Sequence, residues 1–238
     1  MISNEKQVMR SGLPGLDYLL RIPPGIITLR APDPNLLSFL AADIIVRNHC
    51  TGKKILYFHW VDYHKRYWTI DSDMLMRLAK RAGADYSGLC QDLHFVRAFS
   101  KDSVESKENW AGLSDFAQGI GLAVLDSVSE LYEGKQKRVV GSKFLAYAAS
   151  RFMRICMTNR CHGLVLDHSS QPIHPYIGEL SSVIIEFRSN RSPSLAASRN
   201  RRFLNRSLEA DLIKHPMLPD SSFRLSCGLQ RTLRSWTR

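Results

Sequence analysis

Short apolar runs recur along this chain and are separated by longer stretches with a helical pattern. The runs are rich in Ile, Leu, Val and aromatic residues and cover residues 26–29, 55–61, 93–96, 122–125 and 164–166. A strand that is buried on both faces of a sheet has this near-continuous apolar character. The pattern therefore predicts five buried strands between residues 26 and 166.

In the intervening stretches, apolar residues recur at intervals of three or four, which is the spacing of one helix face. This spacing predicts helices near residues 13–20, 36–45, 72–79, 105–118 and 142–158. Asp33 or Asn35 is suited to cap the second of these helices, and Asp71 or Ser72 the third. Strands and helices that alternate in this way are typical of domains built on a parallel sheet.

After residue 180 the pattern changes to strand-like runs at 182–187, 208–213 and 223–225, joined by polar loops. Consecutive strands with no helix between them pair in an antiparallel manner. We therefore expect an α/β fold, with a mostly parallel twisted sheet flanked by helices and an antiparallel C-terminal β extension. The whole chain, 1–238, is expected to form one domain with flexible ends at 1–10 and 229–238.

The strand, loop and helix at 25–46 stand where many α/β proteins have a phosphate-binding loop. The motif of that loop is G-x-x-x-x-G-K-[ST], and its best register here is APDPNLLS, residues 31–38. Ser38 keeps the hydroxyl, but both glycines are missing and Leu37 replaces the lysine. The two prolines of the stretch have no backbone N–H to offer a phosphate. The sequence has the frame of a nucleotide site without its chemistry, and an ordinary strand–turn–helix without a ligand is the alternative.

Charge adds a second feature, because the 238 residues carry a formal net charge of +11. Such an excess favours polyanionic partners, namely nucleic acid or an anionic membrane surface. No apolar run approaches the ~18 residues of a transmembrane span, and the N-terminal stretch lacks the apolar centre of a signal peptide. The five cysteines show no metal-ligand spacing. We expect buried, reduced thiols in a cytoplasmic protein that does not act at a membrane.

In their residues and in their order, several segments resemble the ATPase core of the RecA superfamily, closest to the archaeal RadA recombinases and their paralogues. The matching pieces are SGLPGLDYLL (11–20), GIITL (25–29), DLHFVRAFS (92–100), LAVLDSVSELY (122–132), GLVLDHSSQP (163–172) and LEADLIKHPMLPDSSFRL (208–225). The resemblance covers roughly residues 11–225 and implies a RecA-like fold. It also implies a partnership with DNA or with a RadA-type recombinase.

The resemblance further implies a vestigial nucleotide site. It places Leu37 at the lysine position, Ser38 at the magnesium-binding hydroxyl and Asp126 at the Walker B carboxylate. An alternative role for Asp126 is to cap the following turn together with Ser127. Because a phosphoryl-transfer site works by positioning and charge neutralisation, we expect no catalytic residue and very weak or no ATP hydrolysis. We expect no cofactor, with ATP and Mg²⁺ bound only if the degenerate site still accepts them.

Two more family positions depart from the pattern. The glutamate that would activate the attacking water matches Val61, with Asp62 one residue late, and Asp167-His168 replaces the Asn-Gln sensor pair. The chain also starts almost at the core, without the family's N-terminal DNA-binding domain and polymerisation motif. We therefore expect no assembly into recombinase filaments, although one family-like surface could still bind a RadA-type subunit.

Other chemistries suggested by the sequence have simpler explanations. Five histidines stand near strand ends or in loops: His59, His64, His162, His168 and His174. His59-x-x-Asp62-x-His64 could be drawn as a metal site, but no second pair of ligands accompanies it, so surface histidines are favoured. The letters of a Ser-His-Asp triad occur within residues 167–170, too close together in sequence for the required geometry.

Basic segments are the features of the sequence that indicate a binding partner. In the resembled family, the loop after the Walker B strand binds DNA, and here it contains Lys135, Lys137 and Arg138. The second DNA loop of the family is short in this chain. A basic loop at 188–207 has no acidic residue and holds Arg188, Arg191, Arg199, Arg201, Arg202 and Arg206. Phosphates are its natural partner, and Phe203 could stack on a base; a solvated basic loop is the alternative.

Three hypotheses follow from the sequence. The first is a non-catalytic RecA/RadA-like paralogue that binds DNA, mainly single-stranded, and modulates homologous recombination or DNA repair. The second is a protein-interaction module that docks onto a true RecA-family ATPase. The third is a divergent ATP-binding protein or DNA-dependent ATPase that uses Ser38 and Asp126 with a cation supplied from elsewhere.

Overall fold

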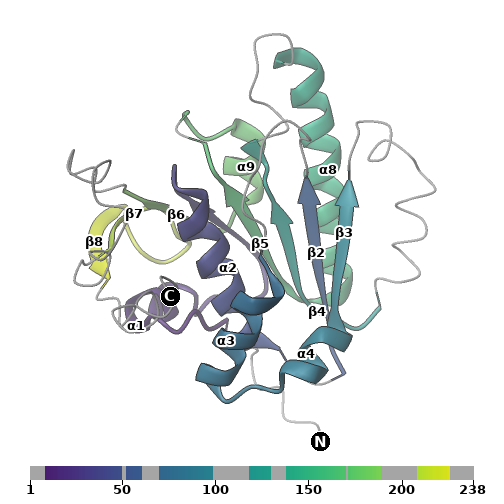
Figure 1. Cartoon of the computed structure of the whole chain (residues 1–238). Coiled ribbons are helices and arrows are strands. Elements are labelled where there is room, and N and C mark those ends of the chain that lie inside the picture. Colours follow the sequence, from purple (N-terminus) through teal and green to yellow (C-terminus); the bar gives the residue numbers. More distant parts are fainter. Residues whose placement is uncertain are drawn as a thin grey trace, which may run out of the picture.

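An eight-stranded sheet with the strand order β3-β2-β4-β5-β1-β6-β7-β8 forms the centre of the molecule (Figure 1). The computed structural model describes residues 9–49, 52–60, 70–98, 118–129, 138–169, 171–188 and 208–225. The strands are β1 Ile26–Arg30, β2 Lys54–Trp60, β3 Leu93–Ala98, β4 Ile120–Asp126, β5 His162–Asp167, β6 Val183–Phe187, β7 Leu208–Lys214 and β8 Ser221–Leu225.

The six strands from β3 to β6 in this order are parallel, and β7 and β8 continue the sheet in antiparallel pairing. The predicted α/β class, with a mostly parallel sheet and an antiparallel C-terminal extension, is thereby confirmed. The central strands β1, β4 and β5 are buried along their whole length. Their near-continuous apolar sequences follow from this burial on both faces.

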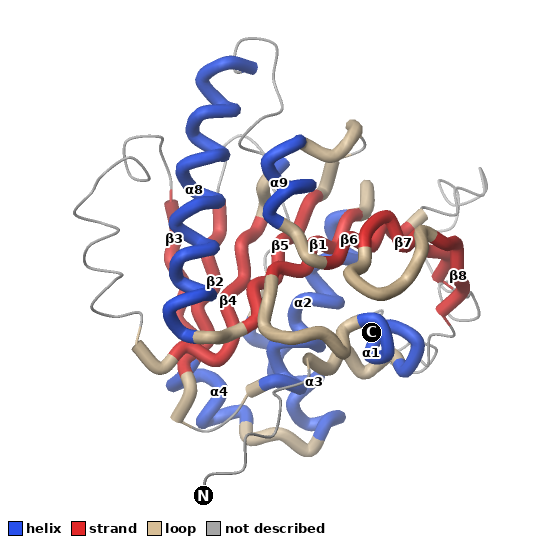
Figure 2. Tube along the Cα trace, turned by 180° about the vertical axis from the view of Figure 1, so that it is seen from behind, coloured by secondary structure: helices blue, strands red, loops and turns tan. Residues whose placement is uncertain are grey.

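Helices cover both faces of the sheet (Figures 1 and 2). The helices are α1 Pro14–Leu19, α2 Pro34–Asn48, α3 Ser72–Ala82, α4 Tyr86–Asp92, α8 Arg138–Asn159 and α9 Pro175–Leu180. Helices α2, α3 and α4 pack on one face, where Ile27 and Val124 belong to the larger apolar cluster. Helices α8 and α9 pack on the other face, where Phe152 and Val165 belong to a second cluster.

Helix α3 shows how closely local sequence determines local structure. The Asp71 carboxylate accepts a hydrogen bond from the Met74 N–H at 2.6 Å, and Gly83 ends the helix with a φ of +66°, which favours glycine. The four apolar residues on the predicted inner face are all buried: Met74, Leu75, Leu78 and Ala79. Asp33 caps α2 in the same way, with the Asn35 N–H at 3.0 Å.

Two short helices were not predicted, and one helix begins earlier than expected. Helix α4 buries only Leu89, and α9, which starts at Pro175, buries only Ile177. A single buried residue leaves no periodic signal in the sequence. Helix α8 begins at Arg138 rather than at residue 142. The helix predicted at 105–118 lies outside the described residues.

Within the described ranges, every helix is too short or too polar to cross a lipid bilayer.

We expect Asp71→Ala to lower the free energy of unfolding by about 1 kcal/mol, because the first turn of α3 loses its side-chain cap. Urea unfolding followed by circular dichroism would measure this loss. Asp73→Ala is the matched control, since Asp73 lies in the same turn and makes only a 3.9 Å ion pair with Arg77. Equal losses in the two variants would contradict the assigned cap.

Candidate functional site

Polar side chains gather at one edge of the parallel sheet, where the strands end. Strand β1 ends with Arg30, β4 with Asp126 and β5 with Asp167, while His59 lies one residue before the end of β2. The register pairs His59 with Asp126 and Arg30 with Asp167. Ligands of open α/β sheets bind at this carboxyl edge, so it is the candidate functional site.

The Asp126 carboxylate is the centre of the first group. The Tyr57 hydroxyl donates to Oδ2 at 2.5 Å, and Nε2 of His168 lies 2.8 Å from Oδ1. Nδ1 of His59 lies 3.4 Å from Oδ2. Both carboxylate oxygens are therefore engaged by side chains of the protein, and Asp126 is only 2% exposed.

The pKa of Asp126 reflects this enclosure. Burial alone would raise it, but hydrogen bonds from His168 and Tyr57 and the nearby His59 imidazole outweigh burial and lower the pKa far below its ordinary value. The carboxylate is thus ionised, and because an ionised carboxylate only accepts, Nε2 of His168 carries a hydrogen. The same contact, together with burial, raises the pKa of Tyr57 well above its ordinary value.

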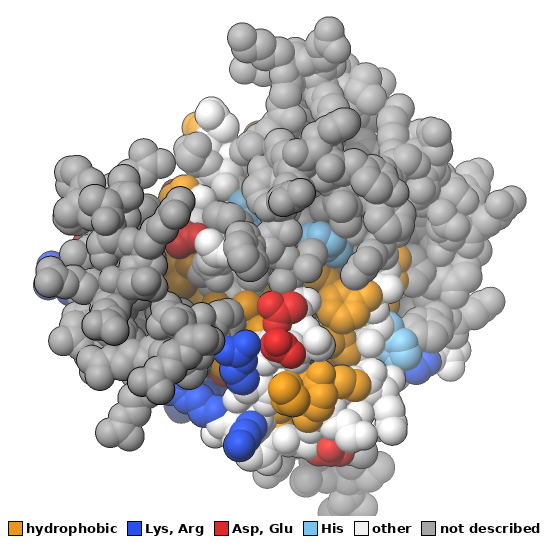
Figure 3. Space-filling model, viewed as in Figure 1, with side chains coloured by type: hydrophobic (Ala, Val, Ile, Leu, Met, Phe, Trp, Pro, Cys, Tyr) orange, Lys and Arg blue, Asp and Glu red, His pale blue; other side chains and the backbone are white. Residues whose placement is uncertain are grey.

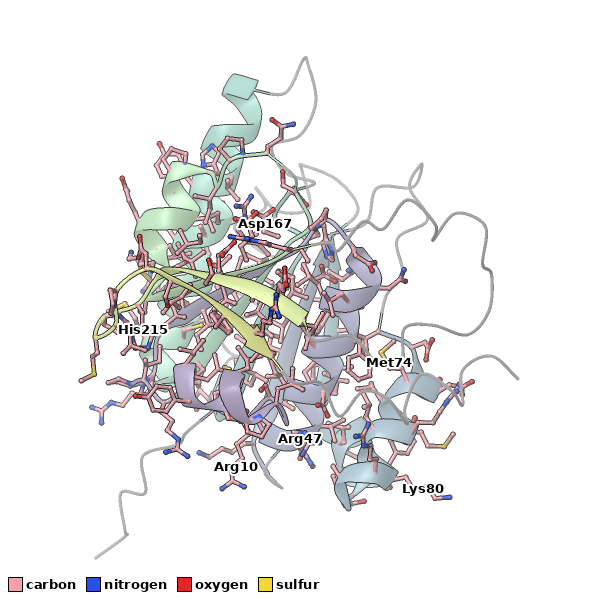
Figure 4. The ribbon with its side chains drawn as sticks, turned by 90° about the vertical axis from the view of Figure 1, so that its left-hand side faces the viewer. Arg10, Arg47, Met74, Lys80, Asp167 and His215 are labelled. Atoms are coloured by element: carbon pink, nitrogen blue, oxygen red, sulfur yellow. The ribbon has the colours of Figure 1, made fainter. Side chains whose placement is uncertain are left out.

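Arg30 is the centre of the second group, which is also buried. Its Nε donates to Asp167 Oδ2 at 2.8 Å, and Nη1 donates to Glu186 Oε2 at 3.2 Å. Nη2 donates to the backbone carbonyl of Gln171. Asp167 additionally accepts the N–H of Ser169 at 3.1 Å. The guanidinium is therefore directed at protein oxygens, and Asp167, near the sheet edge in Figure 4, is fully buried.

The two groups lie on opposite faces of the sheet, because side chains alternate along a strand. Asp126 lies two residues after Val124 on β4, so its side chain is on the same face, the α2 side. Asp167 lies two residues after Val165 on β5, so its side chain is on the other face, the α8 side. His168 follows β5 directly and returns to Asp126 on the α2 side. The two groups therefore lie at the same edge of the sheet, one on each face.

The phosphate-loop position is apolar and internally bonded. Leu37, at the place of the expected lysine, is fully buried in the larger apolar cluster. Asp33 is used as the cap of α2, so its carboxylate takes the Asn35 N–H that a phosphate would need. Ser38 is also buried in the first part of α2, a helix that contacts β4 on the face toward which Asp126 points.

Several predictions about individual residues change with the structure. The prediction of surface histidines is wrong for His59 and His162, which are buried, and His168 is nearly so, since its side chain is only 11% exposed. Ser127 bonds Ser129 at 2.7 Å, and the Asp126 carboxylate bonds Tyr57 and His168 rather than serving as a turn cap. His64 and Asp62 lie outside the described residues.

The cysteine prediction holds for part of the set. Cys156 and Cys161 are buried free thiols, whereas Cys90 is exposed, so the expectation of burial is wrong for Cys90. Cys50 and Cys227 lie outside the described residues. Where side chains are described, no three His, Cys, Asp or Glu residues are grouped as a metal ion would require.

Sequence reasoning missed the part played by Tyr57. The apolar run assigns Tyr57 only to a strand. Tyr57 and His59 are two residues apart on that strand, so they share the face that Asp126 occupies on the neighbouring strand. This alternation was the signal that could have found it.

The predicted DNA-binding residues lie mostly outside the described ranges: Lys135, Lys137, Arg191, Arg199, Arg201, Arg202, Phe203 and Arg206. Arg138 starts α8. Arg188 is described, and its guanidinium makes a bidentate ion pair with Asp211, at 2.5 and 2.6 Å. Its pKa is raised mainly by this hydrogen bond. The exposed side chain of Arg188 is therefore already paired with a carboxylate at the start of the basic loop.

The points at which the chain leaves the C-terminal strands lie side by side. The Arg188 N–H donates to the Glu209 carbonyl at 2.9 Å, next to the start of β7. Leu208, at that start, pairs with Leu225 at the end of β8. The segments after residue 188, before residue 208 and after residue 225 thus meet the described fold at one place. A cavity of about 270 Å³ lies there, lined by Arg188, Glu209, Ala210, Asp211, Ser222, Phe223 and Arg224.

The sequence matches no protein-family model, and no curated protein is significantly similar to it.

We expect Asp126→Asn to lower the free energy of unfolding by about 2–4 kcal/mol at neutral pH, because it breaks a buried hydrogen-bond network around a charge. Asp220→Asn, which changes an exposed aspartate, is the control and should have little effect. Urea unfolding at several pH values would measure both.

The contribution of the Asp126 carboxylate to the free energy of unfolding depends on pH in one direction. A carboxylate whose pKa is lowered on folding stabilises the folded state above its unfolded pKa of about 3.9, and this contribution is lost as pH falls further. The gap between the wild type and Asp126→Asn should therefore be largest near neutrality and shrink below about pH 4. A gap that stays constant down to pH 2 would contradict the ionised, hydrogen-bonded state of Asp126.

Proposed function

We propose that this chain is a RecA-like protein without ATPase activity that binds DNA, mainly single-stranded, and modulates homologous recombination or DNA repair. The proposal combines the resemblance of its segments with two observations. Side chains of the protein occupy the carboxyl edge of the sheet, and the basic segments leave the fold together.

The first observation supports the absence of catalysis. A phosphoryl-transfer site needs a free cation for the phosphates and a carboxylate free to hold hydrated Mg²⁺. Here Leu37 supplies no charge, the Arg30 guanidinium is bonded to Asp167 and Glu186, and the Asp126 oxygens are bonded to Tyr57 and His168. Binding Mg²⁺-ATP would first require breaking buried hydrogen bonds, which is unfavourable.

The second observation carries the DNA-binding part. Residues 189–207 contain five arginines and residues 226–238 three, and neither stretch contains an acidic residue. These eight charges make up most of the net charge of +11. Because Arg188, Leu208 and Leu225 adjoin one another, both stretches meet the sheet at the same place. Basic residues concentrated at one place favour a polyanionic partner such as the phosphate backbone of DNA.

One face of the described surface is of mixed charge. On the face shown in Figure 3, basic and acidic side chains lie near one another rather than forming a single basic area. Helix α8 is an exception, since its 22 residues include four basic residues and no acidic one. Arg151 on this helix lies 5.2 Å from the ring centroid of Tyr147. Helix α8 is therefore a second, smaller candidate contact for DNA.

Docking onto a true RecA-family ATPase remains the second candidate function. Three large apolar side chains on the described surface favour it: Tyr18, Met157 and Met217 are 61%, 70% and 81% exposed. Exposed apolar side chains on this scale occur at protein interfaces, although singly they are also common on monomers.

We expect reversal of Arg199, Arg201 and Arg202 to Glu to weaken binding to a labelled single-stranded oligonucleotide by at least tenfold at low salt. It should also flatten the plot of log affinity against log salt concentration, because fewer phosphate counterions are released. Fluorescence anisotropy over a salt series measures both quantities.

The matched control reverses Arg10, Lys53 and Lys80, which are exposed. Arg10 bonds Asn48 at the end of α2, Lys53 precedes β2 and Lys80 is in the last turn of α3, whereas residue 188 follows the carboxyl end of β6. The control makes the same change in net charge and should weaken binding much less. Equal losses would show a general charge effect and not a local site. No binding of the wild type at low salt would contradict the DNA proposal and favour the docking function.

A further inference from the structure

The end of helix α8 places two cysteines against each other. The Cys161 N–H donates to the Cys156 carbonyl at 3.0 Å, and the Arg160 N–H donates to the Met157 carbonyl at 3.2 Å. Arg160 has a φ of +50°, in the left-handed region. These features define a Schellman motif, in which the side chains at the positions of Cys156 and Cys161 normally touch.

The side chains of the pair are enclosed in the same apolar cluster. Cys156 and Cys161 are at most 3% exposed, and both belong to the apolar cluster beneath α8. Gly163, at the start of β5, leaves room for them, because a Cβ there would lie 2.8 Å from the Cys156 sulfur. The backbone turn and the shared cluster thus place the two cysteine side chains next to each other in the reduced protein.

We propose that Cys156 and Cys161 are a redox pair that forms a reversible intramolecular disulfide when the protein meets a peroxide. In the first step, the Cys161 sulfur, as thiolate, attacks one peroxide oxygen and the O–O bond breaks. The hydroxide that leaves takes up the proton lost by the Cys161 thiol and becomes water, with a sulfenic acid remaining on Cys161. In the second step, the Cys156 sulfur attacks the Cys161 sulfur, and the hydroxyl leaves as water with the Cys156 proton. Two thiols and one hydrogen peroxide become one disulfide and two waters.

Cys161 is suited to react first. The hydrogen bond from Cys156 lowers the pKa of the Cys161 thiol, and the Lys53 ammonium acts in the same direction. The reciprocal contact and burial raise the pKa of Cys156, so Cys156 is the resolving thiol. Of two neighbouring thiols of similar exposure, the one with the lower pKa is the more readily oxidised.

The bond would join the end of α8 to the start of β5. Strand β5 carries Asp167 at its other end and is followed by His168, so both buried groups of the sheet edge depend on its position. A disulfide at this junction would fix the strand relative to α8. The inference is independent of DNA binding and of the absence of ATPase activity.

Peptide mapping tests the pair directly. The experiment uses the full chain with Cys50, Cys90 and Cys227 changed to Ser, so that only the pair remains. The folded protein is treated with hydrogen peroxide, alkylated with N-ethylmaleimide and cleaved with trypsin. Because trypsin cuts after Arg160, between the two cysteines, a disulfide appears as linked peptides that begin at Ile155 and Cys161. We expect these linked peptides, the loss of both alkylatable thiols, and recovery of both with dithiothreitol.

Cys156→Ser in the same background is the control, and it should give no linked peptide and a sulfenic acid on Cys161. Two results would overturn the proposal. One is a linked peptide that forms only after unfolding in urea, which would show that the folded geometry does not permit the bond. The other is oxidation of Cys161 to sulfinic acid without linkage while Cys156 stays reduced.

Discussion

The arrangement of the sheet edge depends on one requirement, that a buried carboxylate must be surrounded by donors. Asp126 ends a strand that is buried throughout, so its charge is removed from water. Tyr57 on β2 and His168 after β5 meet this requirement with hydrogen bonds, and Nδ1 of His59 on β2 lies 3.4 Å from the carboxylate. The donors come from the two strands that flank β4, and the contacts therefore fix the ends of three neighbouring strands relative to one another.

Arg30 is a buried charge of the opposite sign on the opposite face of the sheet, and it too is surrounded by hydrogen-bond partners. A buried guanidinium is tolerable when carboxylates and a carbonyl accept its N–H groups, as Asp167, Glu186 and Gln171 do. Buried ion pairs of this kind add specificity more reliably than stability, because desolvation offsets the Coulomb attraction. Both groups direct their charge inward, and this leaves the edge poorly suited to the phosphates and metal of a nucleotide.

The sequence was sufficient for elements whose signal is periodic and locally capped. Helix α3 was predicted with its four buried residues and with Asp71 as one of two candidate caps, and the order of strands and helices was enough for the α/β class. The short helices α4 and α9 were missed because each buries one residue. The Asp126 group was missed because it joins β2 to β4, and the order of strands in the sheet is not contained in the apolar run that holds Tyr57 and His59. The contact of His168 depends on how the chain turns after β5, which a sequence pattern does not contain.

The central claim is that the edge of the sheet is closed by its own side chains, so that any binding of DNA is independent of nucleotide. The most direct test is a titration of a labelled single-stranded oligonucleotide with the protein at fixed salt, with and without Mg²⁺-ATP, followed by fluorescence anisotropy. The account predicts the same dissociation constant in both conditions. Binding that appears only with Mg²⁺-ATP, or that tightens tenfold with it, would contradict the claim and show that the edge opens to accept a nucleotide.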